Sequence, residues 1–323
     1  MISALRTHAI AFLSIGFLTI LTACGSGLTS GSSGNGNGNG GGNGNGSGAA
    51  AQHVVVVVFE NEDYSTVVGN SSMPYWNQLA SQYSLATQFY ANVHPSMGNY
   101  FLMTAGQDPS AGLSDPDSFS GTLSGDNIAS VLTSAGKTWK VYAQSIPLPG
   151  YTGGDQYPYV KHHNPFAYFQ SVLGSPGQTV NISALSQLST DASGGSLPSY
   201  SFIVPDDEHN GHDCPTGGSS CPLSDRLAAV DSFLNTNIQP LLENSSLANN
   251  TIVIVTFDES ADDNTNGGGR IPVIIAGGPI KTSYQSTTTY QFPSLLRFSL
   301  ESLGVSSYPG AASSAPSMNE FLK

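Results

Sequence analysis

Basic residues are scarce in this chain of 323 residues: nine Lys and Arg stand against 22 Asp and Glu, for a formal net charge of −13. Arg6 lies in the N-terminal segment, so the rest of the chain carries a formal charge of −14. Such an acidic protein repels polyanions, and nucleic acid is therefore excluded as an expected partner. No internal repeat is present, and the roughly 270 residues after the N-terminal segments suffice for one large core.

Cysteine is also rare, with three in the chain. Two of them, Cys214 and Cys221, lie in the glycine-rich stretch CPTGGSSCP. In an exported chain, two cysteines in so short a loop are most simply a disulfide. The alternative is half of a zinc site, although the sequence contains no second pair of cysteines to complete it.

The N-terminal segment has the pattern of an export signal. Arg6 precedes an apolar stretch from Ala9 to Leu21, which is followed by small residues. Leu21-Thr22-Ala23-Cys24 resembles the lipobox of bacterial lipoproteins, whose cysteine becomes the lipidated first residue. We therefore expect a signal peptide at 1–23, lipidation of Cys24, and a protein anchored to a bacterial envelope membrane on its periplasmic or extracellular face. The alternatives are an ordinary cleaved signal or a short membrane anchor.

Residues 24–51 consist mainly of Gly, Ser and Asn, and almost none of them could be buried. This composition is typical of a flexible tether, with an average reach of roughly 25 to 30 Å for a Gly-rich coil of this length. A single folded domain is predicted at 52–323.

Apolar strands alternate with helical patterns through that domain. Strands are expected at 54–59, 85–93, 138–142, 200–204, 251–257 and 272–276, and helices at 73–84, 96–106, 126–136, 223–245 and 292–304. This alternation predicts an α/β fold of the doubly wound type, with a mainly parallel sheet covered by helices on both faces.

Two of the predicted strands end in pairs of oxygen ligands. HVVVVVF precedes Glu60 and Asn61, and TIVIVTF precedes Asp258 and Glu259. In open α/β sheets ligands bind at the carboxyl ends of the strands. Acidic residues brought together there would repel one another unless a cation or a shared proton neutralised them, and such oxygens suit Mg, Ca or Mn. Either pair alone could instead cap a helix or lie at a solvated strand end.

Ser96 is a candidate nucleophile. It follows Pro95 and stands where the predicted helix 96–106 begins. A helix N-terminus offers free N–H groups to a phosphoryl oxygen, and a nearby metal ion would lower the pKa of the hydroxyl. The alternative is that Ser96 only caps this helix.

Most histidines outside the N-terminal segment lie in two polar stretches, KHHNPF (161–166) and PDDEHNGHD (205–213). Histidines in such loops can bind metal, hold phosphate oxygens or protonate a leaving alkoxide. His163 and His212 are the preferred candidates, although a surface histidine has no such role in most proteins.

These motifs, in the order ENEDYSTVVG, HPSMGNYFLMTAG, KHHNPFAYF, PDDEHNGHD and TFDES, resemble the bacterial phosphoesterase family. That family groups acid phosphatases with phosphatidylcholine-hydrolysing phospholipases C inside the alkaline phosphatase superfamily. The resemblance covers nearly the whole folded part and implies an alkaline phosphatase-like fold.

By position, the resemblance implies one divalent metal ion, with its ligands and the other site residues as follows. Metal ligands would be Glu60, Asn61, Ser96, Asp258 and Glu259; Ser96 would be the nucleophile, His163 or His212 the general acid, and Asn164 and Asp213 substrate contacts. We add Asn99, one turn beyond Ser96, as a phosphate contact from helical spacing. The implied reaction is hydrolysis of phosphate monoesters through a phosphoserine.

The sequence departs from the family pattern at one position and excludes a related chemistry. Many members carry a histidine just before the segment SLLR, where this chain has Phe292, so a second metal site is not expected. The Cys/Ser-x-Pro-x-Arg motif of sulfatases is absent, which argues against sulfate esters. The acidic surface would repel phosphate esters less at low pH, and we therefore expect an acid optimum.

Two alternative functions stay open at this level. A phospholipase C would need an apolar groove for acyl chains, and the sequence has no obvious additional lipid-binding domain. An envelope lipoprotein could also bind a phosphorylated ligand without turnover. The sequence does not specify an oligomeric state.

Overall fold

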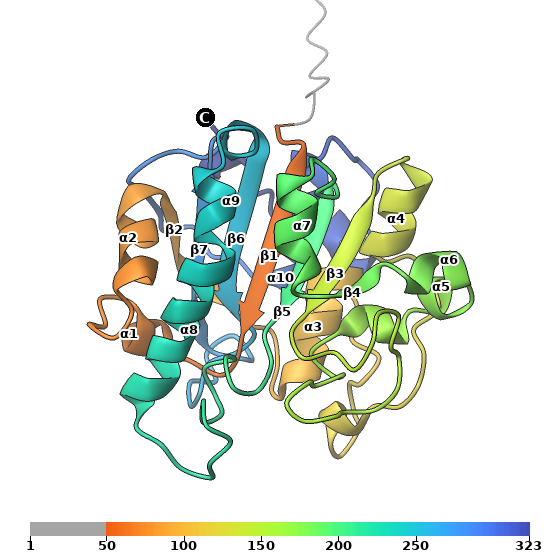
Figure 1. Ribbon diagram of the computed structural model, residues 1–323, viewed down its shortest axis with the longest axis horizontal. Coiled ribbons are helices and arrows are strands. Elements are labelled where there is room, and N and C mark those ends of the chain that lie inside the picture. The colour runs from red at the N-terminus through yellow and green to blue at the C-terminus, as the bar shows by residue number, and fades with distance from the viewer. Residues whose placement is uncertain (1–49) are drawn as a thin grey trace, which may run out of the picture. The chain divides into compact units, whose positions relative to one another are not determined.

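The computed structural model describes residues 50–323, and the predicted signal peptide, Cys24 and most of the predicted tether lie outside them. The core of this region is an eight-stranded sheet in the order β4-β3-β5-β1-β6-β7-β2-β8 (Figure 1). Its strands are β1 (His53–Phe59), β2 (Ser84–Tyr90), β3 (Trp139–Ala143), β4 (Ile182–Ala184), β5 (Tyr200–Val204), β6 (Thr251–Phe257), β7 (Arg270–Gly277) and β8 (Tyr284–Ser286).

Most neighbouring strands run parallel. The pairs β4–β3, β3–β5, β5–β1, β1–β6 and β2–β8 are parallel, whereas β7 is antiparallel to both β6 and β2. β1 and β6 are direct neighbours, with His53 opposite Thr251 and Phe59 opposite Phe257. The two strands that carry the acidic pairs therefore end side by side, as predicted.

The valine run of β1 is buried on both faces of the sheet. Val54, Val56 and Val58 pack into one hydrophobic core, and Val55 and Val57 pack into the other. Because alternate side chains of a strand point to opposite faces, an uninterrupted apolar run requires cover on both sides.

Helices provide this cover in two layers. One core receives side chains from α3 (Ser96–Ala105), α4 (Ile128–Ser134) and α10 (Phe292–Ser302). The other receives them from α2 (Pro74–Gln82), α7 (Gln187–Ser193), α8 (Leu223–Asn237) and α9 (Gln239–Glu243), which lie in front of the sheet in Figure 1. The prediction of a doubly wound, mainly parallel sheet is confirmed.

Two predicted elements differ from the structure by more than two residues at one end. The single helix expected at 223–245 is divided into α8 and α9, and Pro240 stands in the first turn of α9. Proline removes a backbone donor and clashes with the preceding turn, so it starts helices more readily than it continues them.

The strand expected at 85–93 ends at Tyr90, because the chain turns there to approach a glycine-rich loop. The N–H of Ala91 donates to the carbonyl of Gly269, and the N–H of Gly268 donates back to Ala91. A Cβ at Gly267 would lie 1.9 Å from the carbonyl oxygen of Asn92, so only glycine permits this approach.

The shorter elements were not predicted. Besides β4, β8 and the seven-residue helix α7 they are α1 (Tyr64–Val67), α5 (Gln170–Leu173), α6 (Pro176–Thr179) and the 3₁₀ turns at 116–118, 165–168, 248–250, 310–313 and 319–321. Elements of three or four residues are too short to show a hydrophobic period. Within residues 50–323, no helix combines the length and the apolar character required to span a bilayer.

Candidate active site

The carboxyl ends of β1 and β6 bring Glu60, Asp258 and Glu259 together in the interior, each at most 3% exposed. The N–H groups of Asn61 and Glu259 both donate to Asp258 Oδ1, at 3.0 and 2.7 Å. Asn61 has a φ of 49°, in the left-handed region that non-glycine residues rarely adopt. Such backbone strain is concentrated at functional sites.

Ser96 is the first residue of α3 and is 6% exposed. Its hydroxyl donates to Glu60 Oε2 at 3.1 Å, across 36 positions of sequence. The alternative that Ser96 caps α3 is wrong, because Pro95 holds the cap position and makes no side-chain cap bond. Asp117 takes that role instead, since its Oδ1 accepts the N–H of Met97 at 2.9 Å. The hydroxyl of Ser96 is thus directed at the acidic residues.

The acidic residues are unfavourable together without a counter-charge. Burial first, and then Asp258, raises the pKa of Glu60 well above its usual range. The same two causes raise the pKa of Glu259 to about 10, and burial raises the pKa of Asp258. Two further acceptors, Asn61 Oδ1 and Asp258 Oδ2, are buried without a hydrogen-bond partner.

A divalent cation fits this group of atoms. Carboxylate and amide oxygens are the ligands that Mg, Ca and Mn prefer, and a cation would satisfy both unpartnered acceptors. No group of three or more His, Cys, Asp or Glu side chains in the described part of the chain is by itself arranged to hold a metal ion. A cation here would therefore also need the oxygens of Asn61 and Ser96.

The two candidate histidines have different surroundings. His163 is 6% exposed, and its Nε2 lies 3.5 Å from Glu60 Oε1. Burial, reinforced by the neighbouring His162, lowers the pKa of His163 well below its usual value. The side chain of His212 is half exposed, with Nδ1 3.5 Å from Asp213 Oδ2, and this contact raises the pKa of His212. His212 therefore stays protonated to higher pH than His163.

Asn99 does not line the cavity, where we expected it to contact phosphate. Its side chain instead forms hydrogen bonds to the backbone of the segment before α3. Its Oδ1 accepts the N–H groups of Asn92 and Val93 at 2.9 and 3.2 Å, and its Nδ2 donates to the Val93 carbonyl at 2.8 Å. The same Nδ2 lies 3.4 Å from Glu259 Oε2. Asn99 thus braces the loop that leads into Ser96.

Asn164 also lies behind the cavity wall. It is fully buried, and its Nδ2 donates to the Tyr159 hydroxyl at 3.2 Å. Its Oδ1 has no partner. The structure therefore places Asn164 against Tyr159, a residue of the cavity wall.

A cavity of about 340 Å³ opens over Ser96. Its wall consists of Glu60, Asn61, Pro95, Ser96, Asp117, Asp155, Tyr157, Tyr159, Val160, His162, His163, Asp207, His212, Asp213 and Glu259. This wall contains no Lys or Arg. A larger cavity of about 480 Å³, between α7 and the junction of α8 with α9, has no charged residue in its wall and lacks the groups for hydrolytic chemistry.

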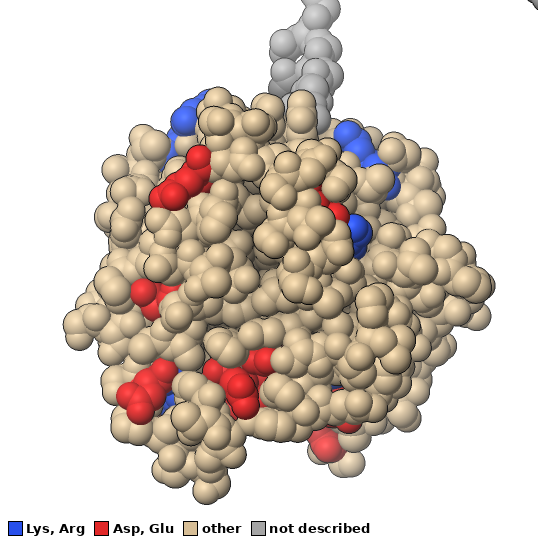
Figure 2. Space-filling model, in the orientation of Figure 1, with Lys and Arg blue, Asp and Glu red and all other residues tan. Residues whose placement is uncertain are grey.

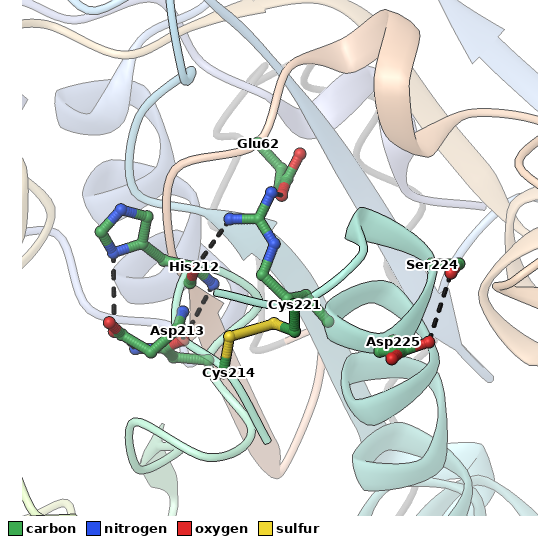
Figure 3. Close-up of a disulfide and its surroundings, with 9 residues drawn as sticks. Glu62, His212, Asp213, Cys214, Cys221, Ser224 and Asp225 are labelled. Carbon is green, nitrogen blue, oxygen red and sulfur yellow. Dashed lines mark hydrogen bonds and ion pairs between the residues drawn. A yellow bond between two sulfur atoms is a disulfide. The ribbon is translucent and has the colours of Figure 1, made fainter. Parts of the chain in front are cut away.

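The loop that carries His212 and Asp213 is closed by a disulfide between Cys214 and Cys221 (Figure 3). The disulfide prediction is confirmed, and the zinc alternative is wrong. The Nη1 of Arg226 donates to the carbonyl of His212 at 2.7 Å. Arg226 and the disulfide therefore hold the chain on either side of Asp213.

Two further contacts to the acidic residues were missed at the sequence level. The hydroxyl of Tyr100 donates to Glu60 Oε1. His94 Nδ1 lies 3.1 Å from Glu259 Oε2, and its Nε2 lies 3.0 Å from the Asp263 carbonyl. Both residues stand inside HPSMGNY, but their spacing alone gave no signal, because the partners are far away in sequence.

A model of the Phosphoesterase family matches residues 69–306. The chain is 29% identical over 239 residues to the phosphatidylinositol-3-phosphatase of Mycobacterium tuberculosis, across 74% of this chain and 73% of that protein. It is 30% identical to a probable acid phosphatase of Kluyveromyces lactis and 28% identical to an acid phosphatase of Aspergillus fumigatus, in each case across 72% of this chain. It spans 52% and 49% of these two fungal proteins, about half their length.

Solved structures agree on the fold. The lipoteichoic acid synthase LtaP from Listeria monocytogenes aligns with a TM-score of 0.57 at 12% identity, across 81% of this chain and 74% of that one. An alkaline phosphatase superfamily protein from Vibrio parahaemolyticus aligns at 0.54 and 17%, across 85% and 73%. The expected family and fold are confirmed: the chain belongs to the Phosphoesterase family and is a phosphoric ester hydrolase.

Proposed function

We propose that this protein hydrolyses phosphate monoesters, as acid phosphatases do, with Ser96 as the nucleophile. One observation carries the proposal: the Ser96 hydroxyl stands at the N-terminus of α3, faces a cavity, and donates at 3.1 Å to Glu60. The names of the similar proteins from Mycobacterium, Kluyveromyces and Aspergillus support the same class of activity.

The phosphoryl group would bind over the start of α3. The free N–H groups of a helix N-terminus attract anionic oxygens. The cavity wall offers no Lys or Arg, so the remaining compensation must come from elsewhere. A divalent ion held by Glu60, Asn61, Ser96, Asp258 and Glu259 would supply it, by neutralising phosphate charge and lowering the pKa of the serine hydroxyl.

The protein's own groups divide the reaction into two displacements. Ser96 Oγ forms a bond to phosphorus while its proton passes to Glu60 Oε2, which already accepts that hydrogen bond. The bond from phosphorus to the alcohol oxygen breaks, and this oxygen takes a proton from His212. Water then attacks the phosphoserine and gives a proton to His212, while Glu60 returns its proton to the departing Ser96 Oγ, so that Ser96 and inorganic phosphate are released.

His212 suits the role of general acid better than His163. Its contact with Asp213 raises the pKa of His212, whereas burial lowers the pKa of His163. His163 instead lies against Glu60. An acid optimum follows, since low pH keeps His212 protonated. Acidic side chains lie toward the edge of the molecule at which β1 and β6 end (Figure 2), and they would repel phosphate esters less at low pH.

The decisive experiment compares wild type with Ser96→Ala on p-nitrophenyl phosphate and on phosphatidylcholine, together with metal analysis of the purified domain. We expect turnover of p-nitrophenyl phosphate to fall by at least 10³-fold in the variant. Ser299→Ala is a matched control, because Ser299 is a buried serine whose hydroxyl donates to a backbone carbonyl of α10.

Three results would contradict the proposal. Full activity of Ser96→Ala would refute the assignment of Ser96 as the nucleophile. Hydrolysis of phosphatidylcholine but not of the monoester would favour phospholipase C. Binding of a phosphorylated ligand without release of phosphate would favour the non-catalytic alternative.

Export and anchoring are proposed separately, because the residues concerned lie outside the described region. A lipid on Cys24 would hold the domain on an envelope membrane through the tether at 24–51. Incorporation of labelled fatty acid into wild type, and its loss in Cys24→Ser, tests this. Equal labelling of both proteins would contradict it.

A further inference from the structure

Tyr100 is a buried side chain at the candidate site to which the reaction above gives no role. It lies one turn beyond Ser96 on α3 and is 1% exposed. Its hydroxyl donates to Glu60 Oε1. A phenol that donates to an ionised carboxylate forms a charge-assisted bond, which is about twice as strong as a bond between neutral groups, and a cation bound beside Glu60 would keep its carboxylate ionised.

This bond divides the two oxygens of Glu60 between different partners. Oε1 faces the Tyr100 hydroxyl, whereas Oε2 accepts the hydroxyl of Ser96. Rotation of the carboxylate would break both contacts. Tyr100 therefore determines which oxygen of Glu60 is available to Ser96, and in which direction its lone pairs point.

The ring of Tyr100 also contacts a second site residue. It stacks on the imidazole of His163, with centroids 5.4 Å apart and planes inclined by 18°. On another side it meets the ring of Phe202 from β5 at 6.3 Å, edge to face. His163 Nε2 lies 3.5 Å from the same Glu60 Oε1. One side chain thus touches Glu60 and His163 at once and is anchored on the sheet.

We propose that Tyr100 is a positioning residue that fixes Glu60 and His163 relative to the Ser96 hydroxyl. The inference rests on the proposed function and adds a residue to it. Ser96 and Tyr100 lie on the same helix, so the distance between them stays the same when α3 shifts. Tyr100 can therefore keep Glu60, the proton acceptor, oriented toward Ser96. Residues that orient metal-binding side chains in this way change metal affinity or activity by about 10- to 100-fold when replaced.

The test is Tyr100→Phe, which removes one oxygen and retains the ring. We expect kcat for p-nitrophenyl phosphate to fall by about 10- to 100-fold with a smaller change in KM. In calorimetric titration with Mn²⁺, Mg²⁺ or Ca²⁺ alone, the affinity of the metal that wild type binds should fall by a similar factor. Thermal unfolding monitors the fold.

Tyr200→Phe is a matched control. Tyr200 is also fully buried, on β5, but its hydroxyl has no hydrogen-bond partner. Removal of that hydroxyl should leave kcat and metal affinity unchanged. A loss in both variants would indicate a general effect of hydroxyl removal from the core, and would overturn the proposal.

Other outcomes separate this inference from the proposed function. If wild type hydrolyses the ester and Tyr100→Phe equals it in kcat and metal affinity, the positioning role is refuted while the function stands. If wild type neither binds these metals nor releases phosphate, the proposed function is refuted, and the positioning role of Tyr100 with it.

A Tyr100→Phe protein that melts earlier needs a second comparison, in the Glu60→Gln background. If Tyr100 acts through Glu60, the two substitutions are coupled, and the double variant loses less stability than the two single losses predict. Additive losses would refute the proposal, because they would show that the Tyr100 hydroxyl does not act through Glu60.

Discussion

Removal of the disulfide should weaken both the stability of the protein and the proton donation assigned to His212. Cys214 and Cys221 are seven positions apart, and Cys214 directly follows Asp213, which lies with His212 in the cavity wall. Loop-closure entropy for eight residues gives about 2.5 kcal/mol in favour of the cross-linked chain. For a domain of this size, that corresponds to a fall in the thermal midpoint of about 5 to 10 °C in the variant Cys214→Ser/Cys221→Ser.

The kinetic effect should depend on the leaving group. His212 would keep its backbone contact with Arg226, at 2.7 Å, but it would lose the constraint from the cross-link. We expect kcat for glycerol phosphate, whose alkoxide needs a proton, to fall about tenfold, or ~1.4 kcal/mol in the barrier. p-Nitrophenolate leaves without a proton, so turnover of its ester should change little.

Parallel kinetics on the two esters, with thermal unfolding of the same preparations, provide the assay. Ser219→Ala is the control, because it changes an exposed residue of the same loop and retains the cross-link. Equal losses on both esters would refute the assignment of His212 as general acid. An unchanged thermal midpoint would refute the view that the cross-link stabilises the protein by restricting the unfolded chain.

Three further predictions concern charge and capping. Burial, together with Asp213 and other acidic neighbours, raises the pKa of Asp207 to about 7, so the folded state retains a proton that the unfolded chain releases above its ordinary pKa near 4. The free energy of unfolding should therefore decrease between about pH 4 and 7, by about 1 to 2 kcal/mol after allowance for partial exposure. Urea titrations of Asp207→Asn should show a smaller decrease over the same range. An identical pH dependence of the unfolding free energy in wild type and variant would contradict this prediction. Because the cavity wall has no Lys or Arg, glycerol phosphate should be hydrolysed faster than phosphoglycerate, which carries a second anionic group, and equal kcat/KM values for the two esters would argue against electrostatic selection. Asp207→Asn should narrow the difference in kcat/KM when it is measured above about pH 7, where Asp207 is ionised. Asp231 accepts the N–H groups of Tyr75 and Trp76 at 3.2 and 2.8 Å at the start of α2. Asp231→Ala should therefore lower the free energy of unfolding, measured in urea, by about 2 kcal/mol without changing kcat. A large loss of kcat in folded protein would contradict a purely structural role.

The local hydrophobic pattern of the sequence was sufficient to predict the architecture of the domain. Uninterrupted apolar runs at 54–59 and 251–257 predicted strands covered on both faces, because no polar residue could face solvent there. The acidic pairs after these runs predicted convergence at one edge of a parallel sheet, and the register of β1 with β6 confirms it. Motif order predicted the family, which the family model confirms.

The contacts within the site were decided by the tertiary structure alone. Ser96 meets Glu60 across 36 positions, Asn61 meets Asp258 across 197, and Asn99 serves its own loop instead of the cavity. The hydrophobic period of a segment reports which of its faces is buried, and that is a local property. The hydrophobic period does not report which distant side chain packs against that buried face. This depends on the order of the strands and on how closely the backbones approach each other. The capping of α3 by Asp117 and the orientation of Glu60 by Tyr100 exist only once the sheet has placed α3 beside β1.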